Sequence, residues 1–382
     1  MVHPSASPRR WRWGWAVLAA VVLIAAGTVT VTRLVGRPLV EAPSGPVAAS
    51  PTATAAATAT ATATATAPAP TASPTPPPGA DITGPLTLLL VGVDTRVKIP
   101  GWVPHSDAVL VLHVPRGLNR AYLFSLPRDL LVDIPAFPKA GYRGGRTKLT
   151  HAMSYGARVP GKPKQPSAAQ GYELLRSTVS RYTGLKIDAG AVLTFGGFDG
   201  LVDALGGVDL YVDQRVPSKH RRPDGQHRPA GAGGYVGPQM VYEKGNRHLN
   251  GWQALDYARQ RYIPGGDYSR QRHQQQLVRA LARKILSQGL ARDPERLQRV
   301  VRALGAALLY AGGERLVDLA YALGGLPSNA FTLVGLPGTG VGSGGAYRGE
   351  QLLPLGRGFL PALRAGKADA YLAAHPQLRI RA

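Results

Sequence analysis

One predicted helix carries an arginine and a glutamine on its apolar face. In the helix predicted over residues 268–288, stepping back from Leu277 by three and then four residues leads to Gln274 and Arg270. Arg270 is therefore predicted to point inward, where a carboxylate or an anionic ligand must balance its charge. The alternative is an arginine that extends into solvent from the first turn.

Two further arginines, Arg259 and Arg261, lie just upstream. Residues two apart lie on the same side of an extended segment but on opposite sides of a helix. If the preceding helix ends near Ala258, both guanidinium groups project together. With Arg270 they would offer three planar sets of donors, which suits a diphosphate. The alternative is two solvated arginines at a helix end, and the neighbouring Tyr262 is predicted to be a packing residue.

Two aspartates border predicted strands. Asp94 directly follows a strand at 86–93, and Asp107 directly precedes a strand at 108–114. If these strands are antiparallel neighbours, both carboxylates come to one end of the sheet and could bind Mg²⁺ together with substrate phosphate. Turn-capping aspartates are the alternative. Arg128 follows the third strand, and Lys148 is a further candidate phosphate ligand, with a surface lysine as the alternative.

The elements that must position these residues alternate along the chain. Strands are predicted at 86–93, 108–114, 121–126, 191–195, 208–212 and 331–334. Helices are predicted at 149–157, 168–183, 198–205, 251–258, 268–288, 293–310 and 314–324. This alternation favours an α/β fold, a three-layer α/β/α sandwich around a central mixed sheet. Residues 217–248 lack periodicity and are predicted to form a long basic loop.

The N-terminal part differs in composition from the rest. An uncharged run at 15–32 follows three arginines, which predicts one transmembrane anchor with residues 1–14 in the cytoplasm. A cleaved signal peptide is the alternative. Residues 33–80 are rich in Ala, Thr and Pro and are predicted to be a disordered linker. The folded domain is then extracytoplasmic and spans 82–382, with a core at 86–285 and C-terminal helices and a strand at 291–382.

Charge and composition narrow the function further. The chain has 45 Lys and Arg against 22 Asp and Glu, a formal charge of +23, and no cysteine. The lack of cysteine excludes a disulfide scaffold and a thiolate zinc site. A basic surface attracts phosphate, nucleic acid or anionic lipid. Nucleic acid is disfavoured because the aromatic residues are not interleaved with a basic stripe.

Six ordered segments carry a family resemblance. They are VGVD ending at Asp94, SD at 106–107, SLPRD at 125–129, KLTHAMSYG at 148–156, FGGFDGLVDALGGVD at 195–209, and LNGWQALDYARQR at 249–261 with GDYSRQRHQQQ at 266–276. In this order they resemble the LytR-CpsA-Psr family of cell-wall glycopolymer ligases. Thr150 stands where that family often has Asn, and His273 where it often has Gln, so small changes in the hydrogen bonding of the site are expected.

The resemblance implies a fold, a reaction and roles for residues. The implied fold is an α/β/α sandwich with a hydrophobic tunnel for a polyprenyl chain and a diphosphate site at its mouth. The implied reaction transfers a glycopolymer, of the teichoic acid, arabinogalactan or capsule type, from a polyprenyl diphosphate carrier to peptidoglycan, typically to the 6-hydroxyl of N-acetylmuramic acid. Two alternative functions remain: a polyprenyl diphosphate hydrolase, and a non-catalytic protein that binds anionic wall polymer.

The same resemblance assigns individual residues. It implies Mg²⁺ held by Asp94 and Asp107. The implied diphosphate ligands are Arg128, Lys148, Arg259, Arg261, Arg270 and Gln274. The implied catalytic residues are Asp107, Arg128 and Asp267, of which Asp267 would orient the arginines or take part in proton transfer. Either Asp107 or Asp267 could accept the proton of the acceptor hydroxyl.

Overall fold

The computed structural model describes residues 79–94, 101–232, 234–287, 307–313, 316–323, 326–327 and 330–380. The predicted cytoplasmic segment at 1–14, the anchor at 15–32 and the linker at 33–80, except for its last two residues, lie outside these ranges. Within the described ranges, no helix is both long and apolar enough to cross a membrane.

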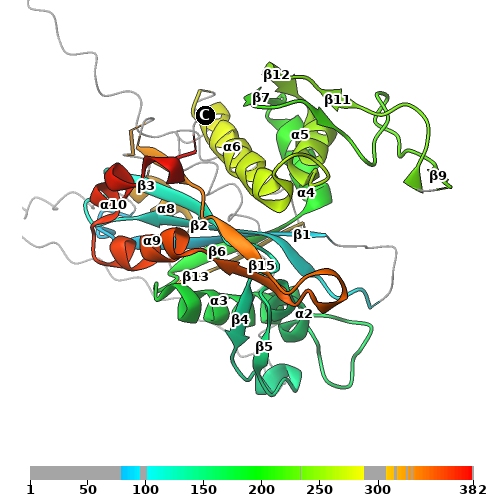
Figure 1. Cartoon of the computed structure of the whole chain (residues 1–382). Coiled ribbons are helices and arrows are strands. Elements are labelled where there is room, and N and C mark those ends of the chain that lie inside the picture. The colour runs from blue at the N-terminus through cyan, green and yellow to red at the C-terminus, as the bar shows by residue number, and fades with distance from the viewer. Residues whose placement is uncertain are drawn as a thin grey trace, which may run out of the picture.

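A six-stranded sheet forms the centre of the described part (Figure 1). Its strands are β1 (Leu86–Asp94), β2 (His105–Val114), β3 (Ala121–Ser125), β6 (Ala189–Thr194), β13 (Leu308–Gly312) and β14 (Phe331–Val334), in the order β13-β6-β1-β2-β3-β14. The β1–β6 and β3–β14 pairs are parallel, and the other neighbours are antiparallel. The sheet is therefore mixed, as predicted.

Helices pack on both faces of this sheet, with α4, α5 and α6 on one side of it and α2 and α3 on the other (Figure 1). The first face carries α4 (Phe195–Ala204), α5 (Gly251–Arg259), α6 (Gly266–Ser287) and α8 (Leu316–Leu323). The second face carries α2 (Thr150–Gly156), α3 (Ala168–Thr183), α9 (Pro354–Arg364) and α10 (Ala368–Ala374). Alternate β1 residues enter the two cores, Leu88 and Leu90 the first and Leu89 and Val91 the second, as expected for a strand buried on both faces.

Short paired strands extend from the sandwich. β7 (Val208–Val212) pairs with β12 (Gly245–Leu249), β8 (Val216–Pro217) with β11 (Val241–Tyr242), β9 (Ala230–Gly231) with β10 (Gly234–Tyr235), β4 (Leu131–Ile134) with β5 (Gly145–Lys148), and β15 (Gly338–Val341) with β16 (Gly349–Leu352). Three short 3₁₀ helices complete the described elements: Pro138–Ala140, Gly344–Ala346 and Pro376–Leu378. The segment at 217–248 is thus not one free loop, because the pairing of β12 with β7 and of β11 with β8 ties it to the domain, and β9 and β10 pair within it.

One predicted helix is wrong at its C-terminal end. The prediction ran from 293 to 310, but Leu308–Gly312 forms strand β13, which pairs antiparallel with β6 at the edge of the sheet. Pairing with a neighbouring strand overrides a local apolar pattern that fits either element. Residues 293–306 lie outside the described ranges.

The start and the end of α5 follow from local chemistry. The Asn250 side chain accepts a hydrogen bond from the Gln253 backbone at 3.1 Å, and the Gln253 side chain accepts one from the Asn250 backbone at 3.1 Å. This reciprocal capping box satisfies two donors that the first turn leaves free. The helix ends at Arg259, and Gln260 is extended, with φ −68° and ψ 125°. Arg259 is therefore the last helical residue, one position beyond the predicted helix end near Ala258, and of the two arginines only Arg261 lies in the extended segment.

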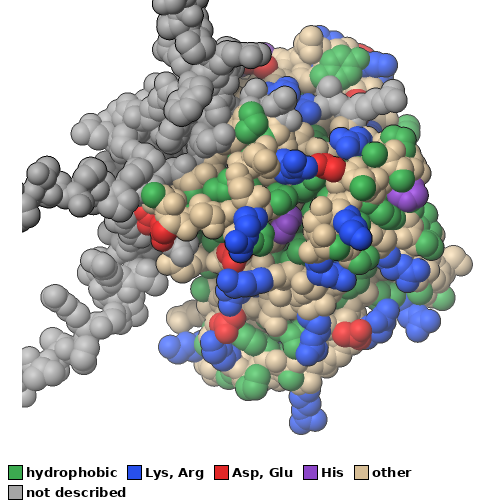
Figure 2. Space-filling view, turned by 90° about the vertical axis from the view of Figure 1, so that its left-hand side faces the viewer, with side chains coloured by type: hydrophobic (Ala, Val, Ile, Leu, Met, Phe, Trp, Pro, Cys, Tyr) green, Lys and Arg blue, Asp and Glu red, His purple; other side chains and the backbone are tan. Residues whose placement is uncertain are grey.

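The described surface is basic, in keeping with the charge of the whole chain. Figure 2 shows Lys and Arg side chains spread over one face, with few Asp or Glu side chains between them. Such a surface raises the local concentration of anionic molecules.

We expect Asn250→Ala to lower the free energy of unfolding by about 1 kcal/mol, because the first turn of α5 loses its cap. The measurement is denaturation in urea. Asn250→Asp is the matched control, since a carboxylate oxygen can accept the same backbone hydrogen bond, and it should stay close to the parent chain. Equal losses in both variants would contradict the capping argument.

Candidate active site

A β-bulge brings the two strand-end aspartates to one side of the sheet. Gly92 pairs with Ala108 and Val93 with Ser106, which leaves Asp107 as an extra residue in β2. In an uninterrupted strand Asp107 would lie on the face opposite Ala108, whereas a bulge can turn its side chain towards the same face. Asp94, at the end of β1, is the antiparallel partner of His105. The predicted approach of the two carboxylates at one sheet end is confirmed.

Each of these aspartates contacts an arginine. Arg128 donates to Asp107, and the Nη2 atom of Arg259 lies 3.4 Å from an oxygen of Asp94. The Arg259 guanidinium also lies over the Phe195 ring, 4.4 Å from its centroid. Arg259 is thus held at the end of the sheet by a carboxylate and by an aromatic face.

Arg270 points inward, as its place on the apolar face of α6 predicts. Its side chain is 6% exposed, and its Nη2 atom lies 2.6 Å from an oxygen of Asp267. Burial lowers the pKa of Arg270, an effect that the nearby carboxylates of Asp267 and Asp107 oppose. Gln271 donates to the other Asp267 oxygen at 2.9 Å, so the carboxylate is held from two sides.

Arg128, Arg261 and Arg270 are close enough to interact through their charges. Asp267 also acts electrostatically on Arg261. The Nε atoms of Arg128 and Arg270 are buried and have no hydrogen-bond partner among the described residues. The three guanidinium groups meet the carboxylates of Asp107, Asp129 and Asp267. The two Nε donors nevertheless lack a hydrogen-bond acceptor, which is expected of a site that binds an anion.

The remaining candidate ligands lie around this cluster. The Nζ atom of Lys148 lies 3.8 Å from an oxygen of Asp129 and 4.7 Å from the centre of the Tyr347 ring. Gln274 donates weakly to the Ala258 carbonyl at 3.4 Å. Tyr262 was predicted to pack, but it is 58% exposed and stacks against cations instead, with Lys219 Nζ 3.4 Å from its ring centre. That prediction is wrong because the chain after α5 runs along the surface.

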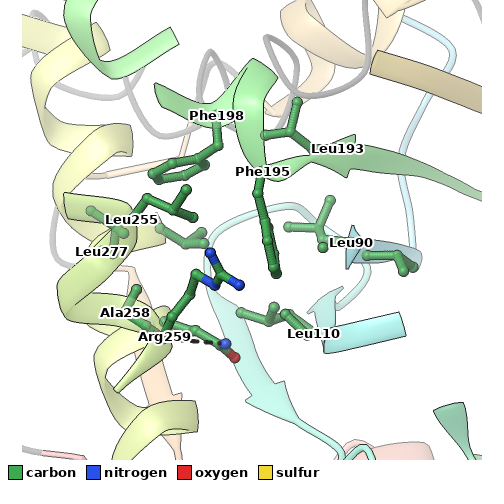
Figure 3. Close-up of a pocket in the computed structure, with 14 residues that line it drawn as sticks. Leu90, Leu110, Leu193, Phe195, Phe198, Leu255, Ala258, Arg259 and Leu277 are labelled. Atoms are coloured by element: carbon green, nitrogen blue, oxygen red, sulfur yellow. Dashed lines mark hydrogen bonds between the residues drawn. The ribbon is translucent and has the colours of Figure 1, made fainter. Parts of the chain in front are cut away.

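An apolar cavity begins beside these polar groups (Figure 3). Phe195 and Phe198 of α4 face Leu255 of α5 across it, and Leu90 and Leu110 form its floor on the sheet. The full lining is Leu90, Val91, Gly92, Ala108, Leu110, Leu193, Phe195, Phe198, Leu255, Ala258, Arg259, Gln274, Leu277 and Val278. Arg259 and Gln274 are its polar members. An apolar cavity with one guanidinium and one amide in its lining fits a molecule with a long apolar part and an anionic head.

The structure adds site residues that the sequence analysis did not single out. Tyr268 donates to Glu350 of β16 at 2.5 Å. Burial raises the pKa of Glu350, and the charges of Asp267 and Asp129 raise it further against the opposing bond from Tyr268. Tyr268 lies within the segment GDYSRQRHQQQ, which carries the family resemblance, so the sequence offered a signal that it belongs to the site. Glu350 lies on the C-terminal β15–β16 hairpin, and no local sequence pattern predicts that this hairpin packs beside the site.

His273 makes its contacts with Asp213 and Tyr257, away from the arginine cluster. It is fully buried, its Nε2 atom lies 3.0 Å from Asp213, and its ring stacks on Tyr257 with 4.3 Å between centroids. Burial lowers the pKa of His273 although Asp213 opposes this. On α6 this residue lies three positions after Arg270 and faces β7 rather than the arginine cluster.

Comparison with known proteins decides the family. A model of the LytR_cpsA_psr family matches residues 48–345. The chain belongs to this family. The match confirms the resemblance drawn from the six segments and extends beyond the range of 86–285 that they covered.

Two relatives illustrate the likeness in sequence. The chain is 28% identical over 201 residues to polyisoprenyl-teichoic acid–peptidoglycan teichoic acid transferase TagU of Bacillus cereus, covering 52% of each chain. It is 28% identical over 206 residues to regulatory protein MsrR of Staphylococcus aureus, covering 53% of this chain and 50% of that one. The chain spans about half the length of these curated relatives.

Solved structures share the fold at lower identity. Protein gbs0355 of Streptococcus agalactiae matches with a TM-score of 0.57 and 22% identity, covering 75% of this chain and 89% of that one. Bacillus subtilis TagV matches with a TM-score of 0.52 and 19% identity, covering 75% and 98%. TagT bound to LI-WTA matches with a TM-score of 0.51 and 23% identity, covering 74% and 89%. At these identities the likeness shows the fold alone.

We expect Asp267→Asn to lower the free energy of unfolding by about 3 kcal/mol, because it leaves the buried charge of Arg270 without its direct partner. Asp133→Asn is the control: it breaks the exposed Arg146–Asp133 pair and should change stability little. Both are measured by denaturation in urea. Equal stability of Asp267→Asn and the parent chain would show that the Asp267 carboxylate is not needed to keep Arg270 buried.

Proposed function

We propose that this protein is an extracytoplasmic transferase that moves a glycopolymer from a polyprenyl diphosphate carrier to peptidoglycan. The observation that carries the proposal is the apolar cavity whose lining includes two candidate diphosphate ligands, Arg259 and Gln274. A prenyl chain belongs in the cavity, and the diphosphate belongs among the guanidinium groups. The similarity to TagU, a teichoic acid transferase, supports the same class of reaction.

The cavity must open to admit a long chain. Its volume is about 80 Å³, well below the roughly 300–1,000 Å³ of ordinary ligand pockets. Protein interiors are close-packed, so a prenyl chain enters only when side chains or whole helices move aside. The lining of the cavity by α4, α5 and α6 makes these helices the elements that would move away from the sheet.

The chemistry follows from the charges at the mouth of the cavity. The acceptor hydroxyl attacks the phosphorus that carries the sugar, the bond from this phosphorus to the bridging oxygen breaks, and polyprenyl phosphate leaves. Arg128, Arg259 and Arg261 stabilise the charge on the diphosphate and on the leaving phosphate, as in other phosphoryl transfers. Gln274 adds a neutral hydrogen-bond donor and Lys148 a charged one. Arg270 adds a charged donor that is buried.

Two carboxylates can serve the proton transfer. Asp107 and Asp267 are each paired with an arginine. Either can accept the proton that the acceptor hydroxyl loses, and Asp267 in addition orients Arg270 through its 2.6 Å contact. The same groups would serve a hydrolase, in which water replaces the acceptor.

The residues present fit a magnesium ion held jointly with substrate. Asp94 and Asp107 lie at one end of the sheet, and the second oxygen of each accepts no hydrogen bond from the described residues. Mg²⁺ is commonly bound by one or two carboxylates plus substrate phosphates. No group of three or more His, Cys, Asp or Glu in the described ranges forms a metal site, so phosphate oxygens would complete the coordination. When bound, Mg²⁺ would neutralise phosphate charge; Asp94 and Asp107 would hold it.

The proposed location follows from the N-terminal sequence. The uncharged run at 15–32 anchors the chain in the membrane, and the Ala/Thr/Pro-rich linker places the domain outside, where lipid carrier and peptidoglycan meet. A basic surface such as that of Figure 2 suits anionic polymer and membrane phosphate.

We expect the chain, extracted in detergent from its host membrane, to co-purify with polyprenyl phosphate or diphosphate. Native mass spectrometry detects this lipid. The Arg259→Ala/Arg261→Ala variant should lose it, because the diphosphate loses two of its charge partners. Lipid-free protein in both cases, correctly folded, would favour the protein that only binds wall polymer.

We expect Arg128→Ala to reduce the rate of transfer by about 100-fold or more, since it removes a charged donor from the reacting phosphates. The assay follows a labelled polyprenyl diphosphate glycan onto peptidoglycan fragments. Arg120→Ala is the control, because Arg120 pairs with Asp369 at the other end of β3. Release of glycan phosphate that does not depend on the acceptor would identify a hydrolase, and an unchanged rate in Arg128→Ala would refute the proposed role of this arginine.

A further inference from the structure

A second cavity lies on the far side of α6 from the active site. It has a volume of about 690 Å³ and is formed by α6 and the β7–β12 ribbon. Its lining is Asp209, Leu210, Tyr211, Asp213, Asn246, Arg247, His248, Gln276, Arg279, Ala280 and Arg283, and we call it the ribbon groove. Arg279 follows Arg270 by nine positions, about two and a half helical turns, so the two side chains leave opposite faces of α6.

The two arginines that α6 contributes to the ribbon groove have no acidic partner among the described residues. Arg279 and Arg283 are one helical turn apart on α6, and neither forms an ion pair with a described residue. Burial and the charge of Arg283 lower the pKa of Arg279 to about 10. Two like charges at this spacing destabilise a helix unless an anion lies between them.

The aspartates of the groove are already engaged with other cations. Asp213 binds Arg272 at 2.5 Å and His273 at 3.0 Å. Burial alone would raise the pKa of Asp213, but these two bonds outweigh it and hold the pKa below its ordinary value. Asp209 binds His248 at 2.7 Å and Lys284 at 3.6 Å. The acids therefore leave the charge of Arg279 and Arg283 uncompensated.

A buried amide adds an unused donor. Gln276 lines the groove and is 4% exposed. Its oxygen accepts a bond from Tyr257 at 3.4 Å, whereas its Nε2 atom is buried and has no partner among the described residues. A buried N–H donor without an acceptor is costly, and a ligand oxygen would remove that cost.

We propose that the ribbon groove is a second anion site, which binds a phosphodiester of the glycopolymer chain away from the reacting diphosphate. Two guanidinium groups and an amide match the several anionic oxygens of such a chain. The volume fits a segment of polymer rather than a single ion. The polymer as ligand rests on the proposed function, whereas the affinity of the groove for phosphate esters rests on these residues alone.

The test uses an oligomer of glycerol phosphate, in which each repeat carries one phosphodiester. It is titrated by calorimetry into the full chain in detergent, with Arg259→Ala/Arg261→Ala present throughout to weaken the active site. Adding Arg279→Gln/Arg283→Gln should raise the Kd at least about tenfold. The matched control is Arg176→Gln/Arg181→Gln, two exposed arginines on α3 across the sheet, which should change the Kd by less than about twofold.

Several results would overturn the proposal. One is an unchanged Kd in the groove variant. Another is an equal loss of affinity in the α3 control, which would assign binding to general surface charge. Without probe, Arg279→Gln/Arg283→Gln should unfold at the same or a higher temperature, because like charges have been removed. A lower temperature would show that these arginines serve the fold.

A vesicle arm separates the two sources of phosphodiester. If the groove variant loses binding to phosphatidylglycerol vesicles but keeps its affinity for the oligomer, the groove recognises a lipid headgroup and the polymer assignment is wrong. Transfer activity plays no part in these readouts, so a failure of the proposed function and a failure of this site are seen separately.

Discussion

A guanidinium group almost completely removed from water determines how the end of this sheet is built. A charge cannot stay buried without compensation, so the structure surrounds Arg270 with carboxylates: Asp267 one turn before it on α6, and Asp107 on the adjacent strand. The bulge in β2 is the local distortion that makes the second of these available. Arg128 and Arg261 then add charge to the same place, and Asp129 supplies a third carboxylate beside Arg128. The buried Nε donors of Arg128 and Arg270 still lack an acceptor, which an anionic ligand would supply.

The same helix separates an apolar space from a polar one. The face of α6 that carries Leu277 closes the apolar cavity against the sheet, and the turn that carries Gln274 and Arg270 changes that face from apolar to polar. This change would align the proposed amphiphilic substrate, because its tail and its head each have only one suitable environment. Positioning of this kind accounts for much of the catalysis available to a phosphoryl transfer.

Much of this arrangement could be predicted from the sequence, wherever the local sequence pattern and the tertiary packing favour the same structure. Arg270 was placed inward from helical periodicity, and the approach of Asp94 to Asp107 from strand ends. The predictions failed where the partner is distant: Leu308–Gly312 became a strand through pairing with β6. Glu350 lies beside Tyr268 because of a distant hairpin, whose position no local sequence pattern predicts. Exposure after a helix end, as at Tyr262, depends on where the chain goes next, which the sequence does not reveal.

The two faces of α6 also explain why its sequence is so polar for a helix within a domain. On one face Arg270 pairs with Asp267. On the other, Arg272 and His273 both bind Asp213, which directly follows β7. After these pairings the far face still presents guanidinium groups that no described carboxylate meets. Unpaired positive charge on the far face of this helix is costly for a protein that binds no anion, and it is expected if the proposed substrate carries phosphate at more than one place along its length.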